Sequence, residues 1–379
     1  QSNAFSNAAW TKAASSITSG QTDPNGGTNA FKIVEDTSTN YHRIFGGYTM
    51  VSGSVYATSV TAKAAGRNYL TLSNNVSSGT CVFNLTNGSI ETQESNVIAA
   101  KTTDLGDGWY RCEMVALGDK SGSYNVFIGA DNDGAIGTYL GDGTSGVLIY
   151  QSQIESSLVA TDYLNSTSVT AKAGVLIDLP RINYDANGEN GALLLEPSRQ
   201  QLIQFSEYFG DSYWTKNNVS VTDNAITSPE GVDNACLLIE NTATSTHEIT
   251  KSFTNTLNAD YCISIFAKAN TRDSIRLSSS DGGFVYFNLV TGEKGTETNA
   301  TGTIEPFNNG WYKCSVVFEA LGTNGSASIR IAESDGVTSY TGQNKSIYIF
   351  GIQYEAGSYS TSYIPNHGTS GGVTRAADS

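Results

Sequence analysis

Hydrophobic and polar residues alternate with a period of two along many short stretches of this chain. The clearest stretch spans residues 261–268, where one face would hold Tyr261, Ile263, Ile265 and Ala267. A period of two is typical of a β-strand, because successive side chains point to opposite faces of a sheet. No window of helical length shows a convincing helical period. The pattern therefore predicts short strands joined by turns.

A second alternating stretch begins at Trp109 and is repeated later in the chain. The sequence GWYRC at 108–112 returns as GWYKC at 310–314. In both copies the alternation separates a core-facing side from a side that carries the Trp and the basic residue. The predicted core-facing residues are Tyr110, Cys112, Met114 and Ala116 in the first copy, and Tyr312, Cys314, Val316 and Phe318 in the second.

The repeat extends over most of the chain. Residues 1–5 correspond to 205–209, and Trp-Thr-Lys follows both segments at the same spacing. A Pro-x-Gly turn, a strand, a His and a final Gln-x-Glu strand with Thr-x-Tyr then come in the same order in both copies. The chain is therefore predicted to contain two copies of one β unit, at residues 1–165 and 201–366.

Many short strands separated by turns favour a two-sheet sandwich, and the jelly roll is the commonest form that protects its sheet edges. The predicted fold is all-β, with two tandem jelly-roll β-sandwiches joined by an apolar β-hairpin connector at 166–200 and followed by a tail at 367–379. So apolar a connector should not remain exposed as a flexible linker. We expect it to pack against a domain or a neighbouring chain, as the contact of a symmetric homo-oligomer. Since Gln1 aligns with Phe205, we also expect the chain to be a piece of a longer protein, and proteolytic maturation is the alternative.

Composition agrees with strands and argues against two kinds of partner. Charged residues make up 15% of the chain, which has 39 Gly and 20 Tyr, as is typical of strands and turns rather than helices. The formal net charge of -15 and the lack of any Lys and Arg cluster argue against nucleic acid. No run approaches the ~18 apolar residues that a membrane span needs. We expect a soluble protein with no membrane insertion.

The chain has five Cys residues, and only Cys112 and Cys314 occupy matching positions in the two copies. The duplication therefore did not copy a disulfide. We interpret all five as small apolar core residues rather than disulfide or metal partners. This use of Cys suits assembly in a reducing cytoplasm, as for a virus particle built inside its host.

Several short motifs occur together in this chain. They are Phe-Ser-x-x-Phe with Trp-Thr-Lys (205–209 and 214–216), Gly-Trp-Tyr-Arg/Lys-Cys, Gln-x-Glu-x-Gly with Thr-Ser-Tyr-Ile-Pro (353–357 and 361–365), Leu-Pro-Arg-Ile (179–182) and Leu-Leu-Leu-Glu-Pro-x-Arg (193–199). Together they resemble the carbohydrate-binding-module-like jelly-roll repeat domains of bacteriophage virion proteins, of the tail-fibre, head-spike and decoration types. The resemblance implies a concanavalin-like sandwich on a particle surface, among other virion proteins and often in adhesion to sugars. The first copy departs from the motif at Ser156 and at 164–165, so its end is expected to pack differently.

Four tryptophans are the candidates for sugar contact. Glycan binding by β-sandwiches usually requires exposed aromatic rings that stack on sugar faces, with polar groups nearby to bind the hydroxyls. A Trp kept in both copies of a duplicated fold is also what core packing would produce, and packing is the competing interpretation. The candidates are Trp10, Trp109, Trp214 and Trp311.

A calcium site is a second hypothesis. Asp131 and Asp133 alternate in a turn that ends in Gly, and Glu333 and Asp335 occupy the matching turn. Alternating oxygen ligands closed by Gly suit Ca²⁺, although the full calcium-loop pattern with its terminal Glu is absent. Plain acidic turns are the alternative. The Gln and Glu of each Gln-x-Glu strand could complete such a site, but a solvated strand edge is the simpler interpretation.

No catalytic pattern is present in the sequence. A Glu-x-Asp-x-x-Glu arrangement of paired carboxylates begins at Glu333 and fails at Thr338. Gly-x-Ser-x-Gly, phosphate-loop and paired-His motifs do not occur. His42 and His247 correspond in the two copies, and we interpret each as structural. The chain is therefore predicted not to be an enzyme.

These observations predict a structural or adhesion protein of a phage-type virion, located on the virion surface as a fibre, spike or capsid-decoration element. Binding to a cell-surface glycan is part of this hypothesis. The alternative is the non-catalytic carbohydrate-binding portion of a secreted polysaccharide-active enzyme. A coat element with no ligand is a third interpretation.

Overall fold

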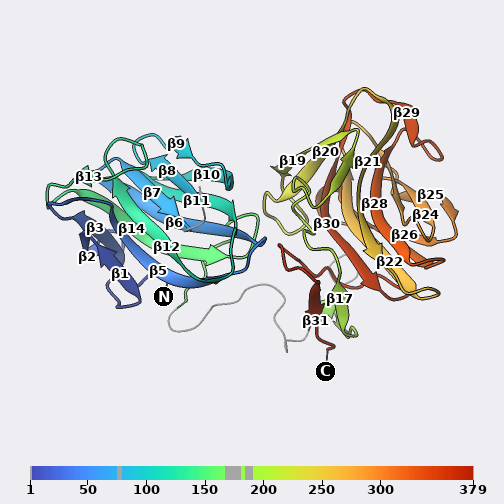
Figure 1. The fold of residues 1–379 in the computed structure, drawn as a ribbon, viewed down its shortest axis with the longest axis horizontal. Coiled ribbons are helices and arrows are strands. Elements are labelled where there is room, and N and C mark those ends of the chain that lie inside the picture. Colours follow the sequence, from blue (N-terminus) through green and yellow to red (C-terminus); the bar gives the residue numbers. More distant parts are fainter. Residues whose placement is uncertain (1, 75–78, 167–180, 184–190, 379) are drawn as a thin grey trace. The chain divides into compact units, whose positions relative to one another are not determined.

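The computed structural model describes residues 2–74, 79–166, 181–183 and 191–378. The chain is all-β and divides into two compact units, residues 1–174 and 175–379 (Figure 1). In each unit two antiparallel sheets enclose a hydrophobic core, which confirms the predicted jelly-roll type of sandwich. No helix among the described residues is long and apolar enough to span a membrane.

Unit 1 is built from two six-stranded sheets, here called its front and back sheets. The front sheet has the strand order β1 (Trp10–Ala13), β5 (His42–Met50), β12 (Gly122–Asp131), β7 (Tyr69–Ser73), β8 (Thr80–Asn84) and β9 (Ile90–Gln93). The back sheet has the order β10 (Val97–Gly106), β11 (Trp109–Leu117), β6 (Val55–Ala65), β14 (Gly146–Glu155), β3 (Ala30–Glu35) and β2 (Ser15–Gln21). A short ladder joins β4 (Thr39–Asn40) to β13 (Tyr139–Leu140).

Unit 2 has the same strand order, as the duplication predicts. Its front sheet is β18 (Thr215–Asn217), β21 (Thr244–Thr254), β28 (Asn324–Ala332), β23 (Ser274–Ser278), β24 (Phe284–Asn288) and β25 (Glu293–Thr298), with β29 (Ser339–Thr341) paired to β21. Its back sheet is β26 (Thr301–Pro306), β27 (Tyr312–Glu319), β22 (Asp260–Ala269), β30 (Ser346–Ala356), β20 (Ala235–Glu240) and β19 (Val219–Ile226). The 3-10 turn η1 (Asn308–Gly310) precedes β27.

Only parts of the predicted connector fall within the described residues. Strand β15 (Arg181–Asn183) pairs with β16 (Ala192–Leu194), while residues 167–180 and 184–190 lie outside the described residues. Strand β17 (Arg199–Gln201) pairs with β31 (Val373–Arg375), so the predicted tail lies beside the start of the second repeat (Figure 1). The role of the connector as a subunit contact stays a prediction.

The core of each unit follows the predicted alternation. Cys112, Met114 and Ala116 on β11 are buried, as are the matching residues of β27. Tyr110 and Tyr312 are partly buried and pack against the core of their own unit. All five Cys residues are free and buried, which confirms their interpretation as apolar core residues.

Candidate functional site

The four candidate tryptophans are all buried. Trp10 and Trp214 belong to the main cores, with 7% and 2% of their surface exposed. Trp109 and Trp311 lie on the other side of their back sheets, as the alternation predicts, but small apolar clusters cover them there. A sugar-stacking platform needs an exposed ring face. The burial of all four rings therefore favours the packing interpretation.

Carboxyl groups of both acidic turns already accept hydrogen bonds from the protein. Asp131 is 3% exposed, and its Oδ1 accepts the backbone N–H groups of Asp133 and Gly134 at 3.1 and 3.0 Å. Burial raises the pKa of the Asp131 carboxyl. In unit 2, Asp335 accepts the backbone and hydroxyl groups of Thr296 at 2.9 and 3.0 Å. No group of three or more His, Cys, Asp or Glu side chains within the described ranges could hold a metal ion. Binding of Ca²⁺ at Asp131, Asp133, Glu333 or Asp335 stays a prediction.

The Gln-x-Glu strands do not form solvated edges, and this expectation is corrected. Gln353 and Glu355 are fully buried, because they bind the backbone of the closing segment that follows β30. Glu355 accepts the Thr361 N–H at 2.8 Å and the Thr361 hydroxyl at 2.7 Å, while Gln353 accepts the Ile364 N–H at 2.7 Å.

The end of unit 1 has the same hydrogen bonds despite its different sequence. Glu155 accepts both groups of Thr161 at 2.8 Å, and Gln153 accepts the Leu164 N–H at 2.7 Å. The difference between the ends is burial: Gln153, Glu155 and Thr161 are only partly buried. We call this arrangement the closing clamp of each unit.

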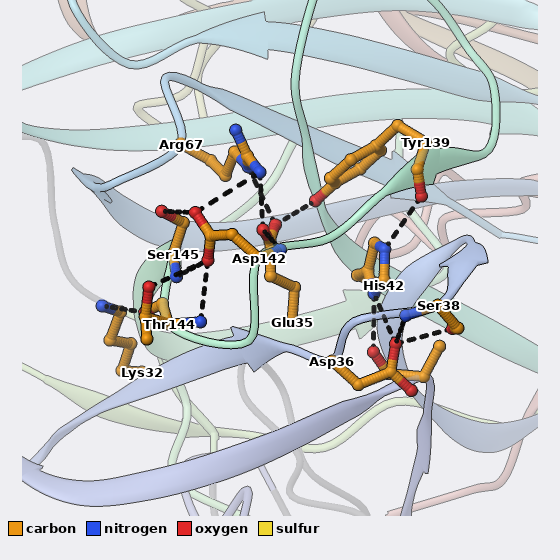
Figure 2. A network of polar contacts seen from close by, with 11 residues as sticks. Lys32, Glu35, Asp36, Ser38, His42, Arg67, Tyr139, Asp142, Thr144 and Ser145 are labelled. Carbon is orange, nitrogen blue, oxygen red and sulfur yellow. Dashed lines mark hydrogen bonds and ion pairs between the residues drawn. The ribbon is translucent and has the colours of Figure 1, made fainter.

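An ion pair between the buried Glu35 carboxyl and the partly exposed Arg67 guanidinium ties the back sheet to the loops at one end of unit 1, as Figure 2 shows. Glu35 accepts the Arg67 Nε–H at 2.8 Å, the Tyr139 hydroxyl at 2.8 Å and the Asp142 N–H at 2.7 Å. Hydrogen bonds from Arg67, Asp142 and Tyr139 outweigh burial and lower the pKa of the Glu35 carboxyl. Nearby, the two ring nitrogens of His42 lie 2.7 and 3.2 Å from carbonyl oxygens, which suits a structural role.

A hollow of about 200 Å³ lies next to this network, on the outer face of the front sheet of unit 1. Its floor is Gly129, which pairs with Arg43 on β5 and with Thr71 on β7. A Cβ atom at Gly129 would come within 3.0 Å of the Arg43 Cβ and 3.2 Å of the His42 carbonyl oxygen. The hollow therefore exists because this position has no side chain.

Arg43 and two aromatic rings form one wall of the hollow. The guanidinium carbon lies 4.1 Å from the centre of the Phe127 ring and 4.8 Å from that of Tyr41. Within the described part of the chain, the buried Arg43 Nε has no hydrogen-bond partner. Burial lowers the pKa of the Arg43 guanidinium. The guanidinium group thus borders the hollow beside an aromatic surface.

Polar and small apolar residues line the rest of the hollow. The polar ones include Thr71 and Ser73 on β7, Thr80 on β8 and Asp131 on β12, and the lining also contains His42, Ala130, Ile136 and Gly137. The volume is below the roughly 300–1,000 Å³ of pockets for drug-sized ligands. The hollow is lined by hydroxyl groups on one side and aromatic groups on the other.

Sequence pattern did not point to this hollow. Arg43, Tyr41 and Phe127 stand outside every motif, and among the predicted site residues only Asp131 borders the hollow. The one available signal was Gly129, which falls within an alternating strand, where an isolated glycine suggests a close approach of backbone or ligand.

Comparison with protein-family models and with curated protein sequences finds no match. Among solved structures, the chain is similar to the CBM22-1 and GH10 modules of the Clostridium thermocellum endo-1,4-beta-D-xylanase 10B complexed with xylohexaose, at 15% identity, a TM-score of 0.27, and coverage of 45% of this chain and 30% of that chain. The chain thus spans under a third of that structure.

Two further similar structures cover more of the chain. The ANXUR1 extracellular domain from Arabidopsis thaliana shares 10% identity at a TM-score of 0.23, covering 93% of this chain and 91% of that one. An anti-sigma factor domain-containing protein from Clostridium clariflavum shares 8% identity at a TM-score of 0.18, covering 94% and 90%. At TM-scores this low, no ligand or residue role is carried over from any of the three.

Proposed function

We propose that this protein is a non-catalytic carbohydrate-binding protein and that the hollow of unit 1 is its sugar site. The observation that carries the proposal is the open floor at Gly129, beside the Arg43 guanidinium and the Phe127 ring. Sugar sites combine apolar ring contact with a few polar groups that fix orientation. The hollow offers both an aromatic ring and polar groups. Because it lies on the outer face of the sheet, a ligand could bind there without displacing a core residue.

The setting that we propose is the surface of a phage-type virion, where the protein would act in adhesion to a cell-surface glycan. The motifs shared with virion repeat domains support this setting. A secreted polysaccharide-active enzyme that uses this chain as its binding portion is the competing setting. The neighbouring genes and the complete reading frame distinguish the two, because tail or capsid genes support the first and an attached hydrolase supports the second.

Filling the hollow tests the sugar site. In the variant Gly129→Val the new side chain would occupy the floor and displace Arg43. The matched control is Gly47→Val on the neighbouring strand β5, where a Cβ would have only ordinary contacts at 3.8 and 3.9 Å. We expect wild type and the control to bind the same glycans on an array, and Gly129→Val to bind at least about tenfold more weakly in affinity electrophoresis, which corresponds to ~1.4 kcal/mol.

Two outcomes would contradict the proposal. One is a wild-type protein that binds no glycan on a broad array. The other is equal binding by Gly129→Val and wild type, which would place the ligand elsewhere. A Phe127→Ala variant provides a second check that leaves the backbone at Gly129 unchanged, and it too should weaken binding, because it removes the ring beside the floor.

A further inference from the structure

One row of residues across the front sheet of unit 2 carries unbalanced charge. Arg330 on β28 pairs directly with Glu248 on β21 and with Arg276 on β23. Arg276 in turn pairs with Tyr286 on β24. All four side chains alternate with core residues, so they share the outer face. Two arginines therefore lie side by side on adjacent strands.

Only one of these arginines has a carboxylate partner. The Arg330 Nε–H donates to Glu248, which also accepts the Asn217 side-chain amide at 3.2 Å. Arg276 interacts with the Tyr286 side chain and more weakly with the Glu248 charge, but it has no ion pair with a described residue, and its buried Nε has no hydrogen-bond partner there. Like charges directly opposite each other destabilise a sheet, and an unsatisfied buried donor adds to that cost.

The surroundings of Arg276 would suit a ligand that is both anionic and rich in hydroxyls. The guanidinium carbon lies 4.2 Å from the centre of the Phe284 ring, which stands perpendicular to the Tyr286 ring at 5.7 Å. In the same neighbouring row as Phe284, the hydroxyls of Thr250 and Ser328 bond to each other at 2.6 Å. Burial, and then the charge of Arg330, lower the pKa of the Arg276 guanidinium. A bound anion would offset the repulsion between the two arginines.

We propose that Arg276 and Arg330 bind the carboxylate group of an acidic saccharide on the front sheet of unit 2. Guanidinium groups present their N–H donors in a fork that matches a carboxylate. The Phe284 ring would contact the sugar, and the hydroxyls along β21 and β28 would hydrogen-bond to it. The site goes beyond the hollow of unit 1, and it rests on the proposed function only for the saccharide part of its ligand.

Without a bound anion, the arginine pair on this sheet would only destabilise it. The chain carries a formal net charge of -15, so its overall field repels anions. A local pair of cations is needed to overcome that repulsion at one point. The corresponding row of unit 1 reads Arg43, Gly129, Thr71 and Val82, and it has no such pair.

The test is titration calorimetry of the full chain with an oligogalacturonate, compared with a neutral galactan oligomer, acetate and sulfate. Wild type should bind the oligogalacturonate, and Arg276→Gln should bind it at least about tenfold more weakly. Lys294→Gln, which removes a surface cation from β25 of the same unit, is the control and should leave this binding unchanged. A merely structural Arg276 would lower the melting temperature on substitution, whereas we expect Arg276→Gln to melt at or above the wild-type temperature, because it removes a like-charge pair.

The remaining outcomes separate this proposal, its saccharide part and the proposed sugar site of unit 1. Equal binding by wild type and Arg276→Gln, or no binding of the oligogalacturonate, overturns the proposal. Acetate or sulfate that binds as tightly as the oligogalacturonate overturns the saccharide part. If no neutral glycan binds the hollow while the oligogalacturonate binds and needs Arg276, the proposed sugar site of unit 1 fails and this site stands. Should Arg276→Gln fail to fold, Arg276→Lys keeps the charge without the fork, and it should still bind measurably more weakly than wild type.

Discussion

At the centre of the front sheet, unit 1 has Gly129 where unit 2 has Arg330. Both residues lie on the third strand of their front sheet, β12 in unit 1 and β28 in unit 2. The inward-facing residues of both strands pack in a hydrophobic core of the same kind. In unit 1 the missing side chain leaves a hollow, whereas in unit 2 the position contributes charge. The core side of each strand is constrained by packing, and the outer side is free to change its chemistry.

The two units also differ in how much charge they bury. The ion pair around Glu35 in unit 1 recurs in unit 2 as Glu240 with Arg272, but Arg272 is 6% exposed and Arg67 is 22% exposed. At the start of the repeats, unit 1 has Asn3 where unit 2 has the buried Glu207. The stability of unit 2 should therefore depend more strongly on its charged groups than the stability of unit 1 does.

The largest loss in the free energy of unfolding is expected when the arginine of each ion pair is removed. Arg272→Met would leave the Glu240 carboxylate buried with no cation beside it, which typically costs about 3–5 kcal/mol. Arg67→Met should cost less, because solvent reaches that pair and screens the charge left on Glu35. Urea unfolding with hydrogen exchange resolved by unit measures both. Equal losses in the two units would contradict the difference in burial.

The second effect concerns pH. Burial raises the pKa of the Glu207 carboxyl to about 7 from a usual value of 4.5, and the exposed Glu230 carboxyl shares a hydrogen-bond donor with it. Both carboxyls contact the Asn234 amide, at 3.2 and 3.4 Å. Folded unit 2 then holds more protons than the unfolded chain between about pH 4.5 and 7, so its stability falls as pH rises through that window.

Unit 1 provides the comparison for this pH effect, because Asn3 and Asn25 stand where unit 2 has Glu207 and Glu230. Glu207→Gln should flatten the pH dependence of unit 2 and stabilise it at pH 8 by on the order of 2 kcal/mol. Unfolding measured at several pH values, again resolved by unit, tests this. A variant whose pH dependence matches that of wild type would show that the pair does not titrate in this range.

The smallest effect is expected at the closing clamps. Thr361→Val removes a hydroxyl from the fully buried Glu355 carboxylate, whereas Thr161→Val does the same at the partly exposed Glu155. The first should cost roughly 1–3 kcal/mol and the second under about 1 kcal/mol, because water can replace the lost hydrogen bond only in unit 1. Thermal unfolding of the two variants provides the ranking, and a reversed order would contradict it.

The fold could be predicted from sequence because alternation and repetition report directly on packing. The buried side of β11 was predicted from residues such as Cys112 and Met114, and the strand order of unit 2 repeats that of unit 1 as the duplicated motifs require. The alternation also placed Trp109 away from the core. It could not show that Ala30 and Tyr150 cover the Trp109 ring, because those contacts join distant strands.

The candidate sites were harder to predict, for a physical reason. The hollow depends on Gly129 lying between Arg43 and Thr71, which come from three strands far apart in the sequence. Pairing register sets which outer residues meet, and a single sequence carries little information on register. The clamp residues Gln353 and Glu355 were predicted to lie at a solvated edge. Alternation along the strand could not show that the segment after it folds back and covers both side chains.

The most direct test of the difference between the two units is a crystal structure of the full chain with a bound oligosaccharide. A neutral glycan selected on the array should occupy unit 1 above Gly129, in contact with Arg43 and Phe127, and should leave the Arg276 row of unit 2 empty. A glycan bound instead at a loop end, or bound alike on both front sheets, would contradict the assignment of separate ligands to the two faces.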